Sequence, residues 1–203
     1  ISVAGSNDGT TIVVTDPGTP SAGGDDLQVS ESDLATGSTP AGTDETTTGS
    51  FTVADTDGLD DVQSLTIGSE TYDLSGESDL SSLNGKIITG DHGTMTITGV
   101  AGGVVSFSYE LTSATSGDNT QETFGLSVSD GTASPATATI SIDIVDDTPT
   151  ANDDANAVTE DTAVSTTGNV LGATGASTND VADVQGADGA SVTAKTYDGD
   201  YGT

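Results

Sequence analysis

Residues 104–111 read Val-Val-Ser-Phe-Ser-Tyr-Glu-Leu, an alternation of apolar and polar side chains that decides the fold class. The serines and Glu110 share one face of an extended chain. The opposite face is apolar and consists of Val105, Phe107, Tyr109 and Leu111. A period of two is typical of a half-buried β-strand, which covers a hydrophobic core on one side and faces water on the other.

Similar short alternating stretches recur along much of the chain. Clusters of Gly, Asp, Asn or Ser bound each of them and favour turns. Only residues 78–83 have a pattern that suits a helical turn. The expected strands are residues 10–16, 50–54, 62–67, 70–74, 86–89, 94–98, 104–111, 124–129 and 136–145. Many short strands at close spacing predict an all-β protein built as an antiparallel β-sandwich.

A repeated acidic pattern predicts two modules in tandem. Residues 25–31 read Asp-Asp-Leu-Gln-Val-Ser-Glu. They resemble residues 153–160, Asp-Asp-Ala-Asn-Ala-Val-Thr-Glu, which follow about one domain length later. We expect residues 10–147 to form one β-sandwich and residues 148–203 to form the N-terminal part of a second, incomplete one. Residues 1–9 would end a preceding module or form a linker.

The charge of the chain excludes several classes of partner. Its 203 residues include 2 Lys plus Arg and 33 Asp plus Glu, a formal net charge of −31. Nucleic acids and anionic lipid surfaces are held by basic side chains, so neither is expected as a partner. No apolar run approaches the roughly 18 residues needed to span a bilayer, so we expect no membrane insertion. Disorder would also fit an acidic chain poor in aromatic residues, but the alternating strands argue against it.

The same composition points to calcium as the cofactor. The chain has no cysteine, so an extracellular form would lack disulfides and need another source of cross-links. Calcium binds six to eight oxygens, largely carboxylates and carbonyls from loops rich in Asp, Asn and Gly. Crowded carboxylates without Lys or Arg among them repel one another unless a cation intervenes.

Three acidic stretches supply the candidate metal ligands. At the second junction, where Asp residues flank a Thr-Pro hinge, they are Asp146, Asp147, Asp153, Asp154 and Glu160, with Asp130 as a contributor from the adjacent end of the sandwich. At the first junction they are Asp8, Asp25, Asp26 and Glu31, beside Asn7. The third stretch offers Asp55 and Asp57, with Asp60 and Asp61 close by. A solvated acidic linker remains the alternative at the junctions, and an ordinary Asp-Gly turn at the third stretch.

The sequence does not favour catalysis. Its one histidine, His92, lies in a Gly-Asp-His-Gly turn, and without cysteine it cannot make a usual structural zinc site. Paired acids could serve a glycosidase, but sugar-binding clefts need aromatic platforms and only 3% of the residues are aromatic. There is no Gly-x-Ser-x-Gly elbow with a matched histidine. We therefore expect a protein that is not an enzyme.

Several short motifs together resemble a known family. Residues 146–151 (Asp-Asp-Thr-Pro-Thr-Ala), 158–162 (Val-Thr-Glu-Asp-Thr), 168–171 (Gly-Asn-Val-Leu) and 197–203 (Tyr-Asp-Gly-Asp-Tyr-Gly-Thr) look like the start of a VCBS-type repeat. Residues 5–145 resemble the related repeat of giant type I-secreted RTX adhesins. The motifs that carry this second likeness are residues 5–9 (Gly-Ser-Asn-Asp-Gly), 14–20 (Val-Thr-Asp-Pro-Gly-Thr-Pro) and 128–131 (Val-Ser-Asp-Gly).

The resemblance implies a structural role outside the cell. Such repeats are Ig-like or cadherin-like β-sandwiches strung in series on the surface of Gram-negative bacteria. They are calcium-stiffened extenders that serve adhesion and biofilm formation, and they carry a distal domain that binds a host or surface ligand. The partners implied are neighbouring repeats and calcium ions. This chain lacks the Gly-Gly-x-Gly-x-Asp nonapeptide array of RTX proteins.

Two other functions stay open at this point. The sandwich itself could bind a glycan or a peptide, for which the few aromatic candidates are Tyr72, Tyr197 and Tyr201. The chain could also be an acidic subunit of a surface layer or filament.

Overall fold

The computed structural model describes residues 7–15, 27–117, 119–153 and 182–192, together with Thr159, Asp161 and Leu171. The strands are β1 (Thr11–Thr15), β2 (Gln28–Ser30), β3 (Thr46–Ala54), β4 (Ser64–Ile67), β5 (Glu70–Asp73), β6 (Ile87–Thr89), β7 (Gly93–Ala101), β8 (Val104–Leu111), β9 (Thr120–Ser129) and β10 (Ala136–Val145). Short 3-10 turns are η1 (Glu31–Asp33), η2 (Leu59–Asp61) and η3 (Ser81–Leu83).

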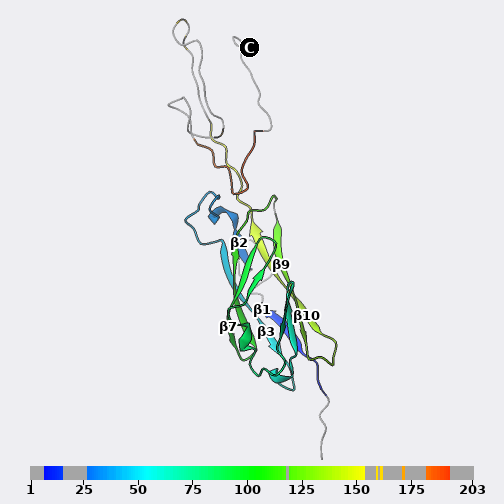
Figure 1. The fold of residues 1–203 in the computed structure, drawn as a ribbon. Coiled ribbons are helices and arrows are strands. Elements are labelled where there is room, and N and C mark those ends of the chain that lie inside the picture. The colour runs from blue at the N-terminus through cyan, green and yellow to red at the C-terminus, as the bar shows by residue number, and fades with distance from the viewer. Residues whose placement is uncertain are drawn as a thin grey trace, which may run out of the picture.

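The strands form two five-stranded sheets that pack face to face as a sandwich (Figure 1). One sheet has the order β1-β3-β8-β7-β6, and the other has the order β2-β10-β9-β4-β5. This arrangement confirms the predicted all-β sandwich. The chain enters β1 at one end of the sandwich and leaves β10 at the opposite end (Figure 1).

The predicted strands are present, but several extend beyond their alternating cores. β3 begins at Thr46 rather than at residue 50, and β9 begins at Thr120 rather than at residue 124. Residues 46–49 read Thr-Thr-Thr-Gly and have no apolar alternation, yet they pair with β8 residue by residue. Pairing with an established strand therefore extends β3 where its own sequence gives no signal. η3 falls inside the predicted helical turn.

One strand pair departs from the antiparallel prediction. β2 runs parallel to β10, with Gln28 opposite Asp143 and Ser30 opposite Val145. The other strand pairs are antiparallel. The sandwich is thus antiparallel only in part, because β2 joins the edge of the second sheet after the chain has crossed over from the first.

The hydrophobic core lies between the two sheets of residues 12–144. Phe107 and Tyr109 of β8 project into it, as predicted from the alternation, and Tyr109 meets Phe124 of β9 edge to face with ring centroids 6.0 Å apart. Gly49 is required beside Phe107, since a Cβ there would lie 2.5 Å from the ring. The buried core residues thus run from Ile12 to Ile144, and Ala187 packs against them.

Part of the predicted second module is described. Thr150 and Val184 form an isolated antiparallel bridge through two backbone hydrogen bonds. Most of residues 154–181 and all of residues 193–203 lie outside the described residues. Within the described part of the chain, no helix is long and apolar enough to cross a membrane.

Candidate metal centre

Three aspartates meet at the end of the sandwich where the chain enters β1. Asp55 follows the last residue of β3, Asp61 closes η2, and Asp130 follows the last residue of β9. One carboxylate oxygen from each lies within 4.8 Å of the oxygens of the other two. We call Asp55, Asp61 and Asp130 the aspartate cluster.

The crossover from β3 to β4 explains why these residues meet. β3 belongs to the first sheet and β4 to the second, so residues 55–63 bridge the open end between the sheets. The Gln63 N–H donates to the Ser129 carbonyl at 2.8 Å, which continues the pairing of β4 with β9 and sets η2 beside the end of β9. The aspartate cluster therefore takes ligands from both sheets.

Local turns fix the direction of two of the carboxylates. Asp130 Oδ1 accepts the N–H groups of Thr132 and Ala133, both at 2.8 Å, and Asp55 Oδ1 accepts the Asp57 N–H at 2.8 Å. The second oxygen of each carboxylate, and Oδ2 of Asp61, is buried and has no hydrogen-bond partner. Asp130 as a whole is only 4% exposed. Each turn thus uses one oxygen for orientation and leaves the other free for a ligand.

The electrostatics of the cluster call for a cation. Removal from water raises the pKa of the Asp61 carboxyl, and repulsion from nearby carboxylates raises it further; these neighbours are Asp55, Asp130, Asp57 and Asp60. In contrast, the N–H groups of Thr132 and Ala133 lower the pKa of Asp130 and keep it charged. The crowding of Asp61 by Asp55, and by an Asp130 that stays charged, therefore favours a bound cation.

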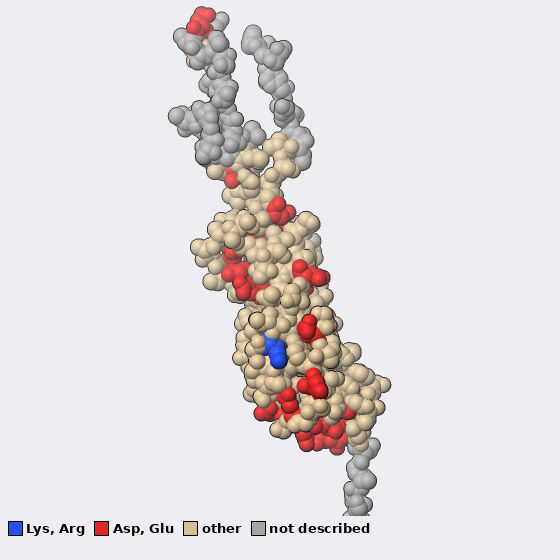
Figure 2. Space-filling model, in the orientation of Figure 1, with Lys and Arg blue, Asp and Glu red and all other residues tan. Residues whose placement is uncertain are grey.

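No Lys or Arg side chain in the described part of the chain neutralises the aspartate cluster. Lys86 is the only Lys or Arg among the described residues, and its Nζ lies 5.8 Å from the ring centroid of Tyr72. Acidic side chains gather over this end of the sandwich, the lower end in Figure 2. A cation from solution would therefore have to neutralise the negative charge of the cluster.

The geometry suits calcium. Calcium–oxygen distances are about 2.3–2.6 Å, so one ion can touch two oxygens up to about 5 Å apart. The oxygens of the aspartate cluster lie within that limit. Calcium also prefers hard carboxylate oxygens and accepts irregular geometry, which fits a site made from two separate loops, the β3–β4 crossover and the β9–β10 turn.

The structure brings together two predicted ligands, Asp55 and Asp130, and adds Asp61. Asp61 lies in the acidic run noted from the sequence but was not among the candidate ligands. Asp57 lies beside the cluster, where its Oδ2 accepts the Asp8 N–H at 2.7 Å and so holds the segment before β1. Asp61 could have been singled out only by knowing that β4 pairs with the end of β9.

Asp130 does not lie near Asp146, where the sequence placed it. The ten residues of β10 separate the two ends of the β9–β10 hairpin, and Asp130 lies at one end while Asp146 follows the other. Glu31 and Asp8 are likewise apart, because Asp8 contacts Asp57 whereas Glu31 contacts Thr115 at the far end of the sandwich. The register of the strands, which loop sequences do not reveal, decides both outcomes.

At the second junction, protein groups already occupy the carboxylate of Asp147. Ser38 donates its N–H to Oδ2 at 2.8 Å and its hydroxyl to Oδ1 at 2.6 Å. Asp146 accepts the Thr148 hydroxyl at 3.3 Å, and Asp153 is exposed. The remaining candidate ligands, Asp154, Glu160, Asp25 and Asp26, lie outside the described residues.

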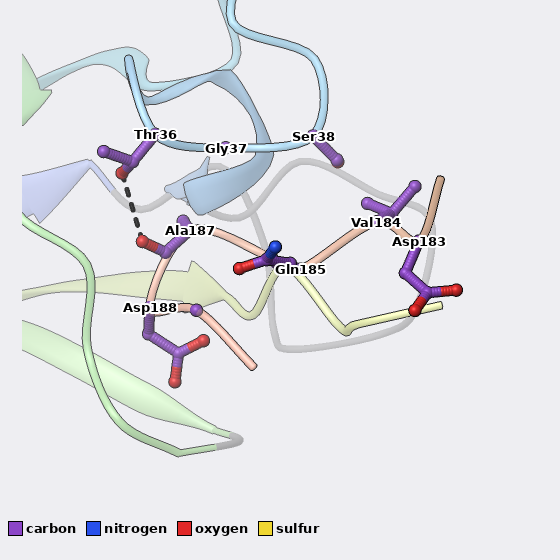
Figure 3. Close-up of a pocket in the computed structure, with 10 residues that line it drawn as sticks. Thr36, Gly37, Ser38, Asp183, Val184, Gln185, Ala187 and Asp188 are labelled. Atoms are coloured by element: carbon purple, nitrogen blue, oxygen red, sulfur yellow. Dashed lines mark hydrogen bonds between the residues drawn. The ribbon is translucent and has the colours of Figure 1, made fainter. Parts of the chain in front are cut away.

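Direct contacts join residues 182–189 to this end of the sandwich. Thr36 donates its hydroxyl to the Ala187 carbonyl at 3.1 Å, as Figure 3 shows, and Asn152 donates its N–H to Asp183 at 2.6 Å. Gly186 has a φ of +74°, and a Cβ there would lie 2.2 Å from the Asp147 carbonyl oxygen. A hollow of about 610 Å³ remains between the two parts, lined by residues 36–38 and 183–189.

Comparisons of the sequence with known proteins show no family for this chain. No model of a known protein family matches it, and no curated protein sequence matches it. A proposal for its function therefore rests on the sandwich fold and on the aspartate cluster.

Proposed function

We propose that residues 10–147 form a calcium-stabilised structural module of a secreted bacterial surface adhesin, which acts as an extender and not as an enzyme. The observation that carries this proposal is the aspartate cluster. Each of its carboxylates has one buried oxygen without a hydrogen-bond partner. One oxygen from each carboxylate lies within 4.8 Å of the other two, close enough to share one ion. Such a set is unfavourable when empty and becomes favourable when calcium binds.

The position of the cluster indicates what the ion would do. Asp55 is attached to the first sheet, and Asp61 and Asp130 are attached to the second, at an end where no strand closes the sandwich. Without a cation, repulsion among the carboxylates pushes the loops apart. With calcium bound, the same carboxylates tie the two sheets together and hold the crossover from β3 to β4.

The affinity expected for such a site matches an extracellular role. Calcium sites of extracellular modules have dissociation constants of about 10⁻⁴–10⁻³ M. They fill in calcium-rich surroundings and stay empty at cytosolic calcium levels. An empty cluster would leave this end of the module looser before export, and the ion would tighten it afterwards.

The path of the chain supports the extender part of the proposal. The segment before β1 is held by Asp57 at the end that carries the aspartate cluster, and the chain leaves β10 at the other end. Modules with entry and exit at opposite ends extend a chain when they are joined in series. The contacts of Ser38 with Asp147 and of Thr36 with Ala187 would restrain the angle at the exit.

Titration calorimetry on the calcium-free chain tests the proposed site. Asp61→Asn keeps the shape of the side chain but removes its charge, so we expect at least a tenfold loss of affinity at one site. Asp60→Asn is the matched control, since it removes the same charge from an exposed residue of the same turn, η2. Equal calcium binding by the wild type and Asp61→Asn would overturn the proposed site.

Small-angle scattering tests the extender role separately. The maximum dimension of the chain should be better defined in calcium than in EDTA, because the ion restrains the end of the module. Identical scattering profiles in the two conditions, despite calcium binding by calorimetry, would leave a metal-binding module without a stiffening role.

A further inference from the structure

A second set of unmatched carboxylate oxygens lies at the opposite end of the sandwich from the aspartate cluster. Glu31, the first residue of η1, is fully buried at 0% exposure. Its Oε1 accepts two hydrogen bonds from Thr115, from the N–H at 2.7 Å and from the hydroxyl at 2.6 Å. Its Oε2 is shielded from solvent and has no hydrogen-bond partner. One half of this carboxylate is therefore positioned and the other half is free.

Glu45 lies at the same end of the sandwich and also faces inward. It precedes β3, and its carbonyl accepts the Leu111 N–H at 2.8 Å, which continues the β3–β8 register by one pair. Residues opposite each other in a sheet point to the same face. Because Leu111 is buried in the core, Glu45 also points between the sheets, and its Oε2 is buried without a hydrogen-bond partner.

The backbone brings the two glutamates to the same end of the sandwich. The Ser30 N–H donates to the Asp44 carbonyl at 2.7 Å, so the end of β2 lies beside the segment that leads into β3. Glu31 is held by Thr115, which follows β8 shortly after Leu111, and Leu111 is the residue that pairs with Glu45. Val29 of β2 is buried, and side chains alternate along a strand, so Glu31 lies on the same inward face as Val29. Each sheet thus contributes one inward-facing glutamate at this end of the sandwich.

Nothing in the described part of the chain neutralises these carboxylates. Lys86, the only Lys or Arg among the described residues, lies over Tyr72. Burying a carboxylate without a counter-charge is strongly unfavourable, and a group of opposite charge reverses the balance. The hydrogen bonds from Thr115 to one oxygen do not serve the free oxygens of Glu31 and Glu45.

We propose that Glu31 and Glu45 form a second calcium site, separate from the aspartate cluster and closing the other end of the sandwich. Glu31 is attached to β2 of the second sheet and Glu45 to β3 of the first, so an ion between them joins the sheets as the aspartate cluster does at its end. Carboxylate oxygens from flexible glutamates suit calcium, which completes its shell with water and carbonyl oxygens. This site stands on its own observations and does not require the aspartate cluster to bind.

Counting bound calcium ions in the 203-residue chain tests the proposal. Calcium titration followed by native mass spectrometry should show one ion fewer for Glu45→Gln than for the wild type. Asp61→Asn should lose a different ion, and the double variant should lose both. Glu110→Gln is the matched control, because Glu110 is an exposed glutamate on the neighbouring strand β8 and should keep every ion.

The outcomes separate this site from the aspartate cluster. An unchanged ion count in Glu45→Gln overturns the second site and leaves the first intact. Loss of an ion in Glu45→Gln but not in Asp61→Asn supports the second site and removes the first. If the glutamine variants fail to fold, anomalous diffraction from wild-type crystals grown in calcium decides, since an ion peak beside both Glu31 and Glu45 is required.

Discussion

The two ends of the sandwich differ in how the carboxylate oxygens of their aspartates are hydrogen-bonded. We call the end where the chain enters β1 the entry end, and the end where it leaves β10 the exit end. At the exit end, Asp33 and Asp147 have both oxygens matched by N–H and hydroxyl groups of the protein. At the entry end, Asp55 and Asp130 have one oxygen matched and one free. The same residue type thus serves as a completed structural clamp in one place and as part of an open ligand set in the other.

The difference lies in the donors that the neighbouring loops present. Around Asp33, the loop folds back so that Thr39 and the Asp44 N–H reach the carboxylate, and these contacts lower its pKa. Close packing there requires Gly42, where a Cβ would lie 1.9 Å from Asp33 Oδ2. At the entry end, the second oxygens meet other carboxylates instead of donors. The contributions of Asp33 and Asp147 to stability should therefore be independent of calcium.

The largest effect that we predict tests this independence. Glu122, 2% exposed, accepts the N–H groups of Asp91 and His92 and the hydroxyl of Tyr109. Glu122→Ala leaves the buried Tyr109 hydroxyl and two part-buried backbone N–H groups unmatched and opens a cavity, so we expect a loss of about 3 kcal/mol in unfolding free energy. Urea unfolding in calcium and in EDTA should give the same loss.

Glu110→Ala is the control for that substitution, because Glu110 is exposed on β8 and should cost less than about 0.5 kcal/mol. A loss for Glu122→Ala that disappears when calcium is removed would mean that Glu122 acts through an ion. In that case the two ends of the sandwich would not differ in the way described above.

The next largest effect concerns calcium itself. Binding to the folded state alone adds about 1.4–2.7 kcal/mol when calcium is about 10–100 times the dissociation constant. Thermal unfolding of the wild type should therefore shift upward by several degrees between EDTA and excess calcium. Asp61→Asn should lose the part of this shift that the aspartate cluster supplies, whereas Asp60→Asn should retain it. A full shift in Asp61→Asn would place all calcium stabilisation elsewhere.

A smaller, local effect is expected at the contact between Asp147 and Ser38. Asp147→Ala removes two hydrogen bonds to a partly exposed loop, and we expect a loss of about 1 kcal/mol that does not depend on calcium. Hydrogen exchange of the Ser38 amide should become faster. Asp146→Ala, which removes only a 3.3 Å contact with Thr148, should leave that amide unchanged.

More of the fold than of the candidate site could be predicted from the sequence. The alternation in residues 104–111 and 136–145 was enough for the sandwich, because burying one face of a strand leaves a direct trace in the order of side chains. The extension of β3 to Thr46 and the parallel pairing of β2 left no such trace, since both depend on a neighbouring strand. Local pattern thus identified the elements, and tertiary pairing set their limits.

For the candidate site, the sequence predicted the kind of ligand, aspartate carboxylates, but not which aspartates would lie together. The sequence singled out Asp55 and Asp130 as metal ligands, but it assigned them to different sites and passed over Asp61. Their meeting depends on β4 pairing with β9 at Ser64 and Ser129, which is a long-range contact. Whether an aspartate is satisfied or free depends on donors such as the Thr132 N–H, and the residue type does not specify them.

The smallest effect that we predict is a difference between the two ends in how their contribution to stability depends on pH. In calcium-free protein, burial and repulsion raise the pKa of Asp61 above its ordinary value of 3.8, so the folded state holds this proton more tightly than the unfolded state does. The contribution of Asp61 to stability is fully present below pH 3.8 and is lost as pH rises through its folded-state pKa. Asp33 has a lowered pKa, so its contribution is present above pH 3.8 and is lost as pH falls through a lower value.

The contribution of Asp61 is lost above pH 3.8 and that of Asp33 is lost below it, so the two pH dependences do not overlap. Comparing the wild type with Asp61→Asn therefore measures the pH dependence of the entry end alone. In EDTA at pH 7, the variant should be slightly more stable than the wild type, and the difference should vanish at about pH 3.5 as Asp61 becomes protonated. In excess calcium at pH 7 the order should reverse, because only the wild type gains the ion. Thermal unfolding of both proteins across this pH range measures the crossover. A wild type that is the more stable of the two in EDTA at pH 7 would show that Asp61 has a favourable partner within the protein, and the contrast between the two ends would then fail.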